Sequence, residues 1–336
     1  MLTAYVSSDV SKKNLDGCLL KPGTKPKYRT FANNPKGFEA FRAWACEHTI
    51  GMEVQFCMEA TGCYHMGLAT FLAEKADFVS VENPRRIKHF AIAANLKNKN
   101  DKLDSYCIAR YAQTMNPRQW GLKDSARREL DAMRTRLRQL SADIRREESR
   151  LENEFLPELV KSQILDHVSF LESKIRQVEE RVREVMVRSD EARRVYNAVT
   201  LLKGAGPETA LLMASLDIHH FDSAKAIPVF FGLNPRHNQS GENTGKTTIS
   251  KAGDAVGRTL LVSAANSAQR YNQVFRDFYD RLRLRGLKHK QAIVAVARKL
   301  LMVAWGIAKA ALEGKPIDYP GGPMQSRNAK KYCTAT

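Results

Sequence analysis

Thr3-Ala-Tyr-Val-Ser-Ser8 and Leu15-Asp-Gly-Cys-Leu-Leu20 are two short runs of apolar, aromatic and β-branched residues, separated by the polar segment Ser11 to Asn14. This pattern predicts two strands joined by a turn. The residues that follow predict, in order, strand 27–32, a helix opened by Asn34-Pro35, strand 54–58, helix 65–75, strand 78–81 and a helix from Pro84. Strands that alternate with helices indicate an α/β layer fold for about the first 115 residues.

Length and charge narrow the class of protein. The 336 residues, 43% of them hydrophobic, suffice for about two domains, and 54 Lys+Arg against 36 Asp+Glu give a net charge of +18. Residues 81–150 hold 17 basic and 9 acidic side chains and residues 236–299 hold 13 and 4, whereas residues 151–235 hold 10 and 13. Two basic blocks predict two surfaces that bind a phosphate backbone. The alternative, long helices that are merely solvated, is weaker because solvated faces are usually balanced in sign.

Several other classes are not expected. No apolar run approaches the roughly 20 residues of a membrane span, and the N-terminus lacks an apolar core behind basic residues. The six cysteines form no Cys-x-x-Cys pair, which argues against a zinc site or a disulfide framework. We therefore expect a protein of a reducing cytoplasm without a membrane partner.

Four carboxylates of the first domain form the first candidate site. Asp9 ends the first strand, Glu59 follows strand 54–58, and Asp101 and Asp104 lie three residues apart at the start of a helix, on one helix face. Four clustered carboxylates need cations to remain ionised. Two Mg²⁺ ions about 4 Å apart would relieve the repulsion and hold the attacking and leaving oxygens of a phosphoryl transfer. Singly, each acid is better explained as a helix cap or surface charge; jointly, they favour a metal site.

Apolar residues then recur at heptad spacing. The first run comprises Leu130, Met133, Leu137, Leu140, Ile144 and Leu151, and the second comprises Leu171, Ile175, Val178, Val182 and Val185. Leu156-Pro157 separates them. Such helices around a proline predict an antiparallel coiled-coil hairpin or an oligomerisation arm. An amphipathic helix packed on its own domain is the alternative.

Gly204-Ala205-Gly206 predicts a turn between two short helices. Its backbone N–H groups beside Pro207 suit a nucleic-acid phosphate, and a plain helix–helix turn is an equal alternative. Further helices, expected at 252–270, 272–285 and 288–312, make the C-terminal region mostly α-helical, and a Pro/Gly-rich flexible tail is expected at 316–336.

The polar loop Gly232–Ser250 holds the second candidate site. Gly241 to Thr247 differs from an ATP-binding phosphate loop, because three residues rather than four separate its glycines and no hydrophobic strand precedes it. Ser240 is a hydroxyl in an electropositive loop whose basic residues are Arg236, Lys246 and Lys251. Such a serine can attack a phosphodiester when cations stabilise the oxyanion and a base or metal accepts its proton. An ordinary loop serine is the alternative.

The ordered combination of these motifs is specific. It comprises Asp9 in Ser-Ser-Asp-Val-Ser-Lys-Lys, Glu59 in Met-Glu-Ala-Thr-Gly-Cys-Tyr, Asp101 and Asp104 in Asn-Lys-Asn-Asp-Lys-Leu-Asp, and Ser240 downstream of Gly-Leu-Asn-Pro-Arg. The combination resembles the DEDD insertion-sequence transposases related to Piv-type DNA invertases, which are the bridge-RNA-guided recombinases. The resemblance covers about residues 3–312. Ser8 departs from the small apolar residue or glycine often seen before the first aspartate, yet leaves the acid in place.

The resemblance implies a RuvC-like (RNase H fold) domain at 1–118, coiled-coil and linker helices at 119–190 and a transposase domain at 191–315. In that family the four acids bind Mg²⁺, so the ligands implied are Asp9, Glu59, Asp101 and Asp104. Ser240 would form a covalent link to a DNA 5′ phosphate and release a 3′ hydroxyl. The nucleic-acid contacts that we expect are Arg236, Lys246, Lys251, Gly204 and Gly206.

The resemblance also implies a homo-tetramer on a noncoding guide (bridge) RNA that pairs with donor and target DNA, in a bacterial or archaeal cytoplasm or nucleoid. The leading hypothesis is therefore an RNA-guided, Mg²⁺-dependent DNA recombinase of an insertion sequence. The first alternative is a RuvC-like nuclease or junction resolvase that hydrolyses DNA, with Ser240 structural. The second is a non-catalytic nucleic-acid scaffold.

Overall fold

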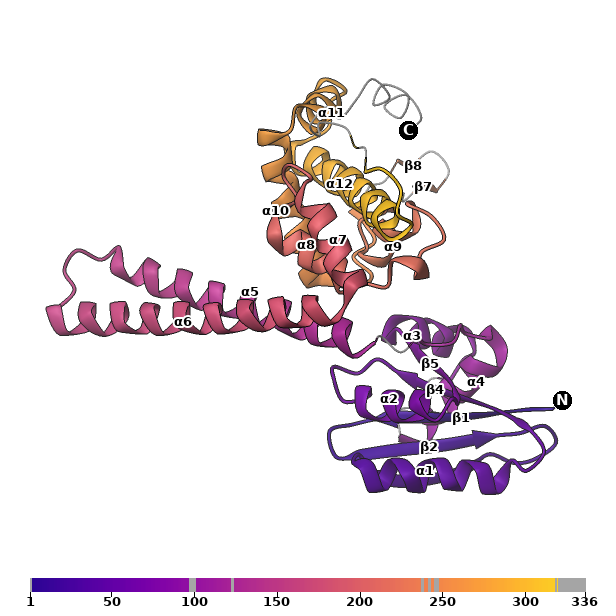
Figure 1. The fold of residues 1–336 in the computed structure, drawn as a ribbon. Coiled ribbons are helices and arrows are strands. Elements are labelled where there is room, and N and C mark those ends of the chain that lie inside the picture. The colour runs from indigo at the N-terminus through magenta and orange to yellow at the C-terminus, as the bar shows by residue number, and fades with distance from the viewer. Residues whose placement is uncertain are drawn as a thin grey trace. The chain divides into compact units, whose positions relative to one another are not determined.

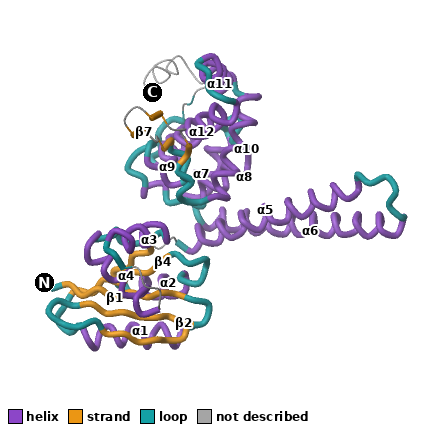
Figure 2. The backbone as a smooth tube through the Cα atoms, turned by 180° about the vertical axis from the view of Figure 1, so that it is seen from behind, coloured by secondary structure: helices purple, strands orange, loops and turns teal. Residues whose placement is uncertain are grey.

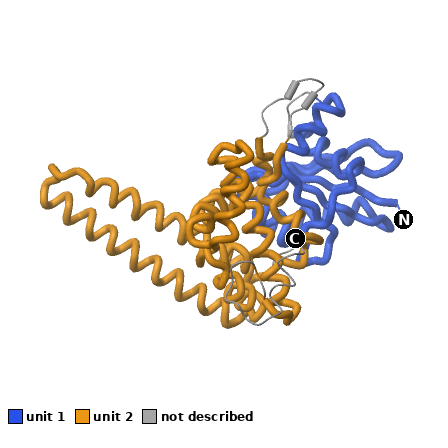
Figure 3. Tube along the Cα trace, turned by 90° about the horizontal axis from the view of Figure 1, so that it is seen from above, with its two compact units in different colours: residues 1–122 blue, residues 123–336 orange. Residues whose placement is uncertain are grey.

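The computed structural model describes residues 2–96, 101–121, 124–236, 239–240, 243–244, 248–317 and 319. The chain folds into two compact units, residues 1–122 (unit 1) and residues 123–336 (unit 2), which Figure 3 shows in two colours. Unit 1 combines a β-sheet with helices, and unit 2 is mostly helical. The mixed α/β class expected for the N-terminal part and the helical class expected for the C-terminal part are thereby confirmed.

Unit 1 is built on a five-stranded sheet in the order β3-β2-β1-β4-β5 (Figure 1). Its strands are β1 (Thr3–Val10), β2 (Asn14–Leu20), β3 (Lys27–Ala32), β4 (Glu53–Glu59) and β5 (Phe78–Glu82). β1 and β3 are each antiparallel to β2, whereas β4 is parallel to β1 and β5 is parallel to β4. The carboxyl ends of β1, β4 and β5 therefore meet at one edge of the sheet.

Helices cover both faces of this sheet. On one face lie α1 (Pro35–His48) and α2 (Met66–Glu74), and Phe41, Phe56 and Leu72 are buried there in one cluster. On the other face lies α4 (Asp101–Met115), with α3 (Pro84–Ala93) packed beside it; Cys57 and Ile108 are buried there. Because successive strand residues point to opposite faces, Phe56 and its neighbour Cys57 belong to different clusters. Alternate residues along a strand therefore face the α1–α2 layer and the α4 layer in turn.

Unit 2 begins with two long helices, α5 (Ser125–Leu151) and α6 (Glu158–Arg188), which lie side by side in a hairpin (Figure 2). Three of the heptad residues, Leu130, Leu140 and Val185, are almost fully buried, and two of them, Leu130 and Val185, belong to the hydrophobic core of unit 2. The interruption predicted at Leu156-Pro157 is confirmed, since Pro157 is the N-cap residue of α6. A backbone N–H at the start of a helix forms no hydrogen bond within that helix. Pro157, which has no backbone N–H, therefore occupies this position without loss of a helical hydrogen bond.

The rest of unit 2 is a helical body around one hydrophobic core. Its elements are α7 (Asp190–Thr200), α8 (Gly206–Ala214), the 3₁₀ turn η1 (Ile218–His220), α9 (Ala226–Phe230), α10 (Ala255–Tyr271), α11 (Gln273–Leu284) and α12 (His289–Leu312). In α12, Val296, Leu300 and Ala304 are fully buried. Length and composition alone would let α12 cross a membrane, but more than half of its apolar window is buried within the protein. Its hydrophobicity is therefore explained by the core of unit 2.

The segment predicted as a polar loop at 232–250 contains two short strand pairs. β6 (Pro235–Arg236) pairs with β9 (Thr248–Ile249), and β7 (Gln239–Ser240) pairs with β8 (Asn243–Thr244). The first pair forms the base of the loop against the helical body. The second lies further out along the same excursion and contains Ser240.

Candidate active site

Hydrogen bonds and packing show which helix the N-terminal acids face. The Ser7 hydroxyl donates to the backbone carbonyl of Ser105 in α4 at 2.5 Å, so Ser7 points toward α4. Asp9 lies two residues later on the same strand and therefore faces the same side. Cys57 packs in the cluster that contains α4, and Glu59, two residues beyond it, also faces α4.

Strand register brings acids of four neighbouring strands into one line. Ser8 is paired with Met58, so the residues that follow them, Asp9 and Glu59, are neighbours across β1 and β4. Glu59 is in turn paired with Glu82 of β5, and Asp9 is paired with Asp16 of β2. Residues directly opposite each other project from the same face of a sheet. We call this line, Asp16-Asp9-Glu59-Glu82, the acid row.

Asp104 of α4 adds a further carboxylate to the acid row. Burial and the nearby negative charges of Asp9 and Asp104 raise the pKa of the Glu59 carboxyl above its usual value. Burial, with the charges of Asp104 and Glu59, also raises the pKa of the Cys107 thiol to about 11. The charges of three predicted acids, one each from β1, β4 and α4, therefore act on one another. Asp101 begins α4, and its side chain lies outside the described residues.

The donor chemistry of this site fits a divalent cation. Among the described side chains no three His, Cys, Asp or Glu groups are close enough together to hold a metal ion directly. However, carboxylate oxygens are the ligands that Mg²⁺ prefers, often with several waters retained. Burial is the larger cause of the raised pKa of Glu59, and repulsion from Asp9 and Asp104 adds to it; a bound cation would offset both.

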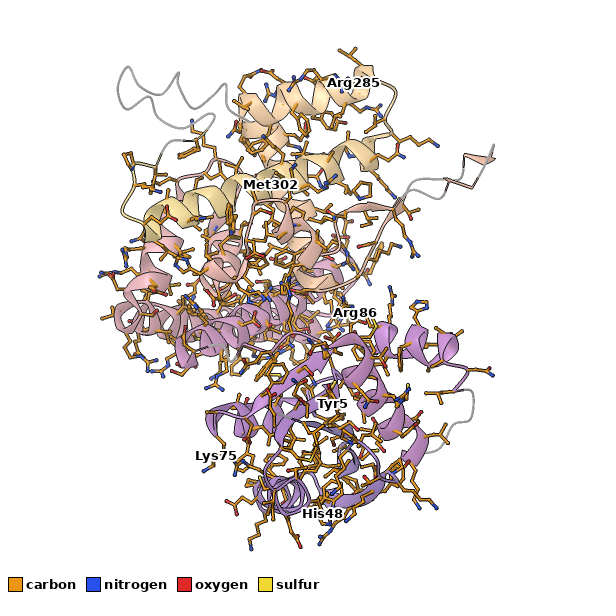
Figure 4. The ribbon with its side chains drawn as sticks, turned by 90° about the vertical axis from the view of Figure 1, so that its right-hand side faces the viewer. Tyr5, His48, Lys75, Arg86, Arg285 and Met302 are labelled. Atoms are coloured by element: carbon orange, nitrogen blue, oxygen red, sulfur yellow. The ribbon has the colours of Figure 1, made fainter. Side chains whose placement is uncertain are left out.

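Glu82 is a site residue that the sequence interpretation did not single out. It is 7% exposed, accepts a hydrogen bond from the Tyr111 hydroxyl at 3.2 Å and forms an ion pair with Arg86 at 3.0 Å. Burial and the Glu82 charge raise the pKa of Tyr111 to about 12. Figure 4 labels Arg86, whose side chain is largely exposed. The available signal was that Glu82 ends its strand just as Glu59 ends the preceding one in the chain.

The second predicted site belongs to unit 2. Ser240 lies in β7, where its backbone pairs with Asn243, and its side chain lies outside the described residues, as do His237 and Lys246. Arg236 is exposed in β6 opposite Thr248. Lys251 is exposed and has a left-handed backbone, with φ of 54°. Two of the three predicted basic neighbours thus lie at the base of the loop.

The glycine turn has a packing role that the sequence did not indicate. Gly204 and Gly206 both have positive φ, 97° and 71°. A Cβ on Gly204 would lie 2.3 Å from Cα of Ala268 in α10, whereas a Cβ on Gly206 would meet no atom within 4 Å. Gly204 is therefore required by close helix packing, while the backbone around Gly206 is open to a ligand.

A sheet with an acid row at the ends of its parallel strands, followed by a helical unit, is consistent with a RuvC-like DEDD transposase, an enzyme that recombines DNA. Residues 6–159 match the DEDD transposase model of the IS110 group, and residues 196–280 match the transposase model of the IS116/IS110/IS902 family. The chain belongs to this IS110 family of transposases.

Individual relatives agree with that assignment. The pilin gene-inverting protein of Moraxella bovis is 29% identical over 324 residues, which are 95% of this chain and 98% of that protein. The same is true of the pilin gene-inverting protein of Moraxella lacunata. The transposase for insertion sequence element IS1111A of Coxiella burnetii is 32% identical over 135 residues, 38% of this chain and 36% of that protein.

Proposed function

We propose that this transposase cuts DNA with the hydroxyl of Ser240, that the carboxylates of unit 1 hold Mg²⁺, and that a noncoding guide RNA selects donor and target DNA. The observation that carries the proposal is the acid row together with Asp104, in a chain of the IS110 family. The relatives named for pilin gene inversion and for transposition suggest two outcomes of one chemistry, inversion or movement of a DNA segment.

In this proposal Asp9, Glu59 and Asp104, together with Asp101, hold two Mg²⁺ ions. When bound, Mg²⁺ supplies Lewis-acid stabilisation of charge on phosphate oxygens. Glu82 is a positioning residue: its bonds to Tyr111 and Arg86 fix the end of β5 beside Glu59. Asp16 is held by the Thr30 hydroxyl at 2.6 Å and closes the other end of the acid row.

Ser240 provides the nucleophile. Its oxygen attacks a DNA phosphorus and its proton passes to a base. The bond from phosphorus to the 3′ oxygen breaks, and the departing 3′ oxygen takes up a proton, so a 5′-phosphoserine and a free 3′ hydroxyl result. After strand exchange a 3′ hydroxyl attacks the phosphoserine, and the serine oxygen leaves and regains a proton. The number of phosphodiester bonds is thereby conserved without a nucleotide cofactor.

The two basic blocks support the nucleic-acid part of the proposal. Residues 81–150, from the end of β5 through α5, contain one block, and residues 236–299, from the Ser240 loop to the middle of α12, contain the other. We assign backbone contacts to Arg236, Lys246 and Lys251 and to the turn at Gly204 and Gly206. A protein whose guide RNA supplies sequence specificity needs only such shape and backbone contacts. The proposed place of action is the cytoplasm or nucleoid of a bacterium or archaeon.

The proposed assembly is a tetramer in which the α5–α6 hairpin serves as a coiled-coil arm. Apolar side chains at its far end support this role, because Phe155 is 93% exposed and Leu159 is 70% exposed. Exposed apolar side chains that lie near one another, as these two do at one end of the hairpin, are the kind of surface through which proteins associate. The proposed domains are residues 1–118, 119–190 and 191–315.

The test is adduct formation. The protein is purified with its flanking transcript, incubated with Mg²⁺ and end-labelled element-junction DNA, and resolved on a denaturing gel. A protein–DNA adduct is expected with the wild type, and none with Ser240→Ala, with Asp9→Ala or after removal of Mg²⁺. Ser250→Ala, a change in the same loop, is the matched control and should retain the adduct.

Other outcomes would contradict the proposal in distinct ways. Free cut DNA without an adduct would mean that the carboxylates hydrolyse DNA and Ser240 is structural. Full recombination by Asp9→Ala and Ser240→Ala would mean that the protein is a scaffold. Adduct formation that survives ribonuclease treatment during purification would remove the guide RNA from the proposal.

A further inference from the structure

A pocket of unit 2 lies beside the base of the Ser240 loop. It has a volume of about 690 Å³, within the usual range for pockets that bind small ligands. One wall comes from β6, β9 and the residues next to them, and the other from the start of α12 and the turn before it. The lining side chains that matter most are Ile249, Leu287, Val294, Lys251, Lys290 and Arg298.

The described residues of the lining are mostly aliphatic, and the charged side chains among them are all basic. Lys251, Lys290 and Arg298 line the pocket, and among the residues that the structure describes no Asp or Glu lines it. Within the part of the chain that the structure describes, none of the three forms an ion pair, in contrast to arginines of the α5–α6 hairpin such as Arg181, which contacts Glu129 at 2.6 Å. The pocket therefore has an unbalanced positive charge around an apolar interior.

Arg298 provides a second, independent indication of a ligand. Its Nε atom is buried and has no hydrogen-bond partner among the described residues. Buried donors in native proteins are nearly always bonded, so an orphaned guanidinium nitrogen at a pocket wall indicates a missing acceptor. An anionic oxygen suits it best, because a guanidinium forms strong bonds to phosphate.

We propose that this pocket binds one unpaired nucleotide of the DNA strand that Ser240 cuts. The base enters between β9 and α12, against Ile249 and Val294, and its phosphate is held by Lys290 and Arg298. The charge and the flat apolar faces of a nucleotide match cations around aliphatic walls. This inference rests on the proposed function, in which Ser240 cuts DNA. The strand bound in the pocket is taken to be the cut strand because β6 and β9, which line the pocket, form the base of the loop that carries Ser240.

The test measures binding without cleavage. The full chain, in a Ser240→Ala background without Mg²⁺, is titrated into single-stranded DNA of about 12 nucleotides that contains one 2-aminopurine. Because no aromatic side chain lines the pocket, the base should brighten as it leaves its stacked neighbours. Ala295→Phe, which fills the pocket, and the double change Lys290→Gln with Arg298→Gln are each expected to weaken binding about tenfold and to abolish the brightening.

Controls keep the result interpretable. Lys299→Gln combined with Lys309→Gln removes the same number of charges from the same helix outside the pocket and should change affinity less than threefold, with brightening intact. Thermal melting identifies any variant that fails to fold, and the Gln variants test the pocket without adding bulk. A further control uses a set of strands that each carry an abasic site at a different position. The wild type should bind one of these strands about tenfold more weakly than the intact strand and the others normally.

Three outcomes would overturn the proposal. They are unchanged binding by the pocket variants, equal affinity for every abasic strand, and dependence on Lys290 and Arg298 with an RNA strand but not with DNA. Because cleavage is not measured, a failed adduct experiment and a failed pocket experiment are distinguishable. If the wild type forms no adduct but the 2-aminopurine fluorescence still rises on binding, the serine chemistry is contradicted and the pocket proposal is not.

Discussion

At the scale of single residues, the proposed chemistry depends on carboxylates that repel one another when no cation is bound. Glu59 is central, because it lies between Asp9 and Glu82 in the acid row and near Asp104. Its raised pKa is a cost of function: a carboxylate that binds a cation well is poorly placed without one.

Glu59→Gln tests this cost directly. A carboxyl whose pKa is raised by folding holds its proton more tightly in the folded state, so the stability of the metal-free protein should fall as pH rises through the raised pKa. Glu59→Gln should therefore increase thermal stability at pH 7 without Mg²⁺ and abolish the adduct. We expect Mg²⁺ to raise the melting temperature of the wild type and not that of Glu59→Gln. Glu53→Gln, at the exposed start of the same strand, should do none of these.

Glu82→Ala tests the proposed positioning residue. It leaves the Tyr111 hydroxyl and the Arg86 guanidinium without their acceptor, so the free energy of unfolding should fall by about 1–3 kcal/mol in urea titration. Glu82→Gln keeps an acceptor for Tyr111 and should recover part of that loss. Glu74→Ala, an exposed acid at the end of α2, is the control. Equal stability of Glu82→Ala and the wild type would contradict the role assigned to Glu82.

At the scale of elements, the two glycines of the turn between α7 and α8 differ in why the structure needs glycine there. Gly204→Ala would place a methyl group against Ala268 in a left-handed backbone, and we expect a loss of about 2–5 kcal/mol in the free energy of unfolding. Gly206→Ala has only the backbone strain and should cost about 1 kcal/mol. Urea unfolding of both variants checks the order. If Gly206→Ala nevertheless loses DNA affinity, the proposed phosphate contact gains support.

The α5–α6 hairpin makes a prediction about assembly. Phe155→Asp combined with Leu159→Asp replaces exposed apolar side chains at the far end of the hairpin, away from the buried heptad residues. Light scattering should detect a smaller species than the wild-type assembly, while circular dichroism and thermal stability stay unchanged. Lys161→Asp, an exposed polar change in the same turn region, should leave the assembly intact. An unchanged mass for the double variant would exclude this end of the hairpin as an association surface.

At the scale of the whole molecule, the net charge of +18 predicts steep salt dependence. If about six phosphates are contacted, affinity for duplex DNA should fall roughly 10³-fold between about 50 and 200 mM salt, because each contact releases counterions. Fluorescence anisotropy measured across that salt range gives the slope. A shallow slope would mean that the two basic blocks are solvated surfaces and not nucleic-acid contacts.

The sequence alone was sufficient for the features that depend on local order. Short runs of apolar, aromatic and β-branched residues predicted the five strands of unit 1, and Asn34-Pro35 predicted the start of α1, where the Asn34 side chain accepts a hydrogen bond from the Gly37 amide. Heptad spacing on either side of Leu156-Pro157 predicted the two long helices α5 and α6. These follow from backbone propensity and side-chain periodicity within a few turns. The motifs around Asp9, Glu59 and Asp104 were also visible as strand and helix ends.

Only the tertiary structure decided which residues meet across those elements. Glu82 and Asp16 joined the acid row because strand order and register, not sequence distance, set their neighbours. The need for glycine at position 204 comes from Ala268 in another helix. The cationic pocket combines β6 and β9, at residues 235–249, with α12, which begins at residue 289. Contacts of this kind depend on how hydrophobic faces pack together, and a one-residue change of register would reverse which face each strand residue occupies.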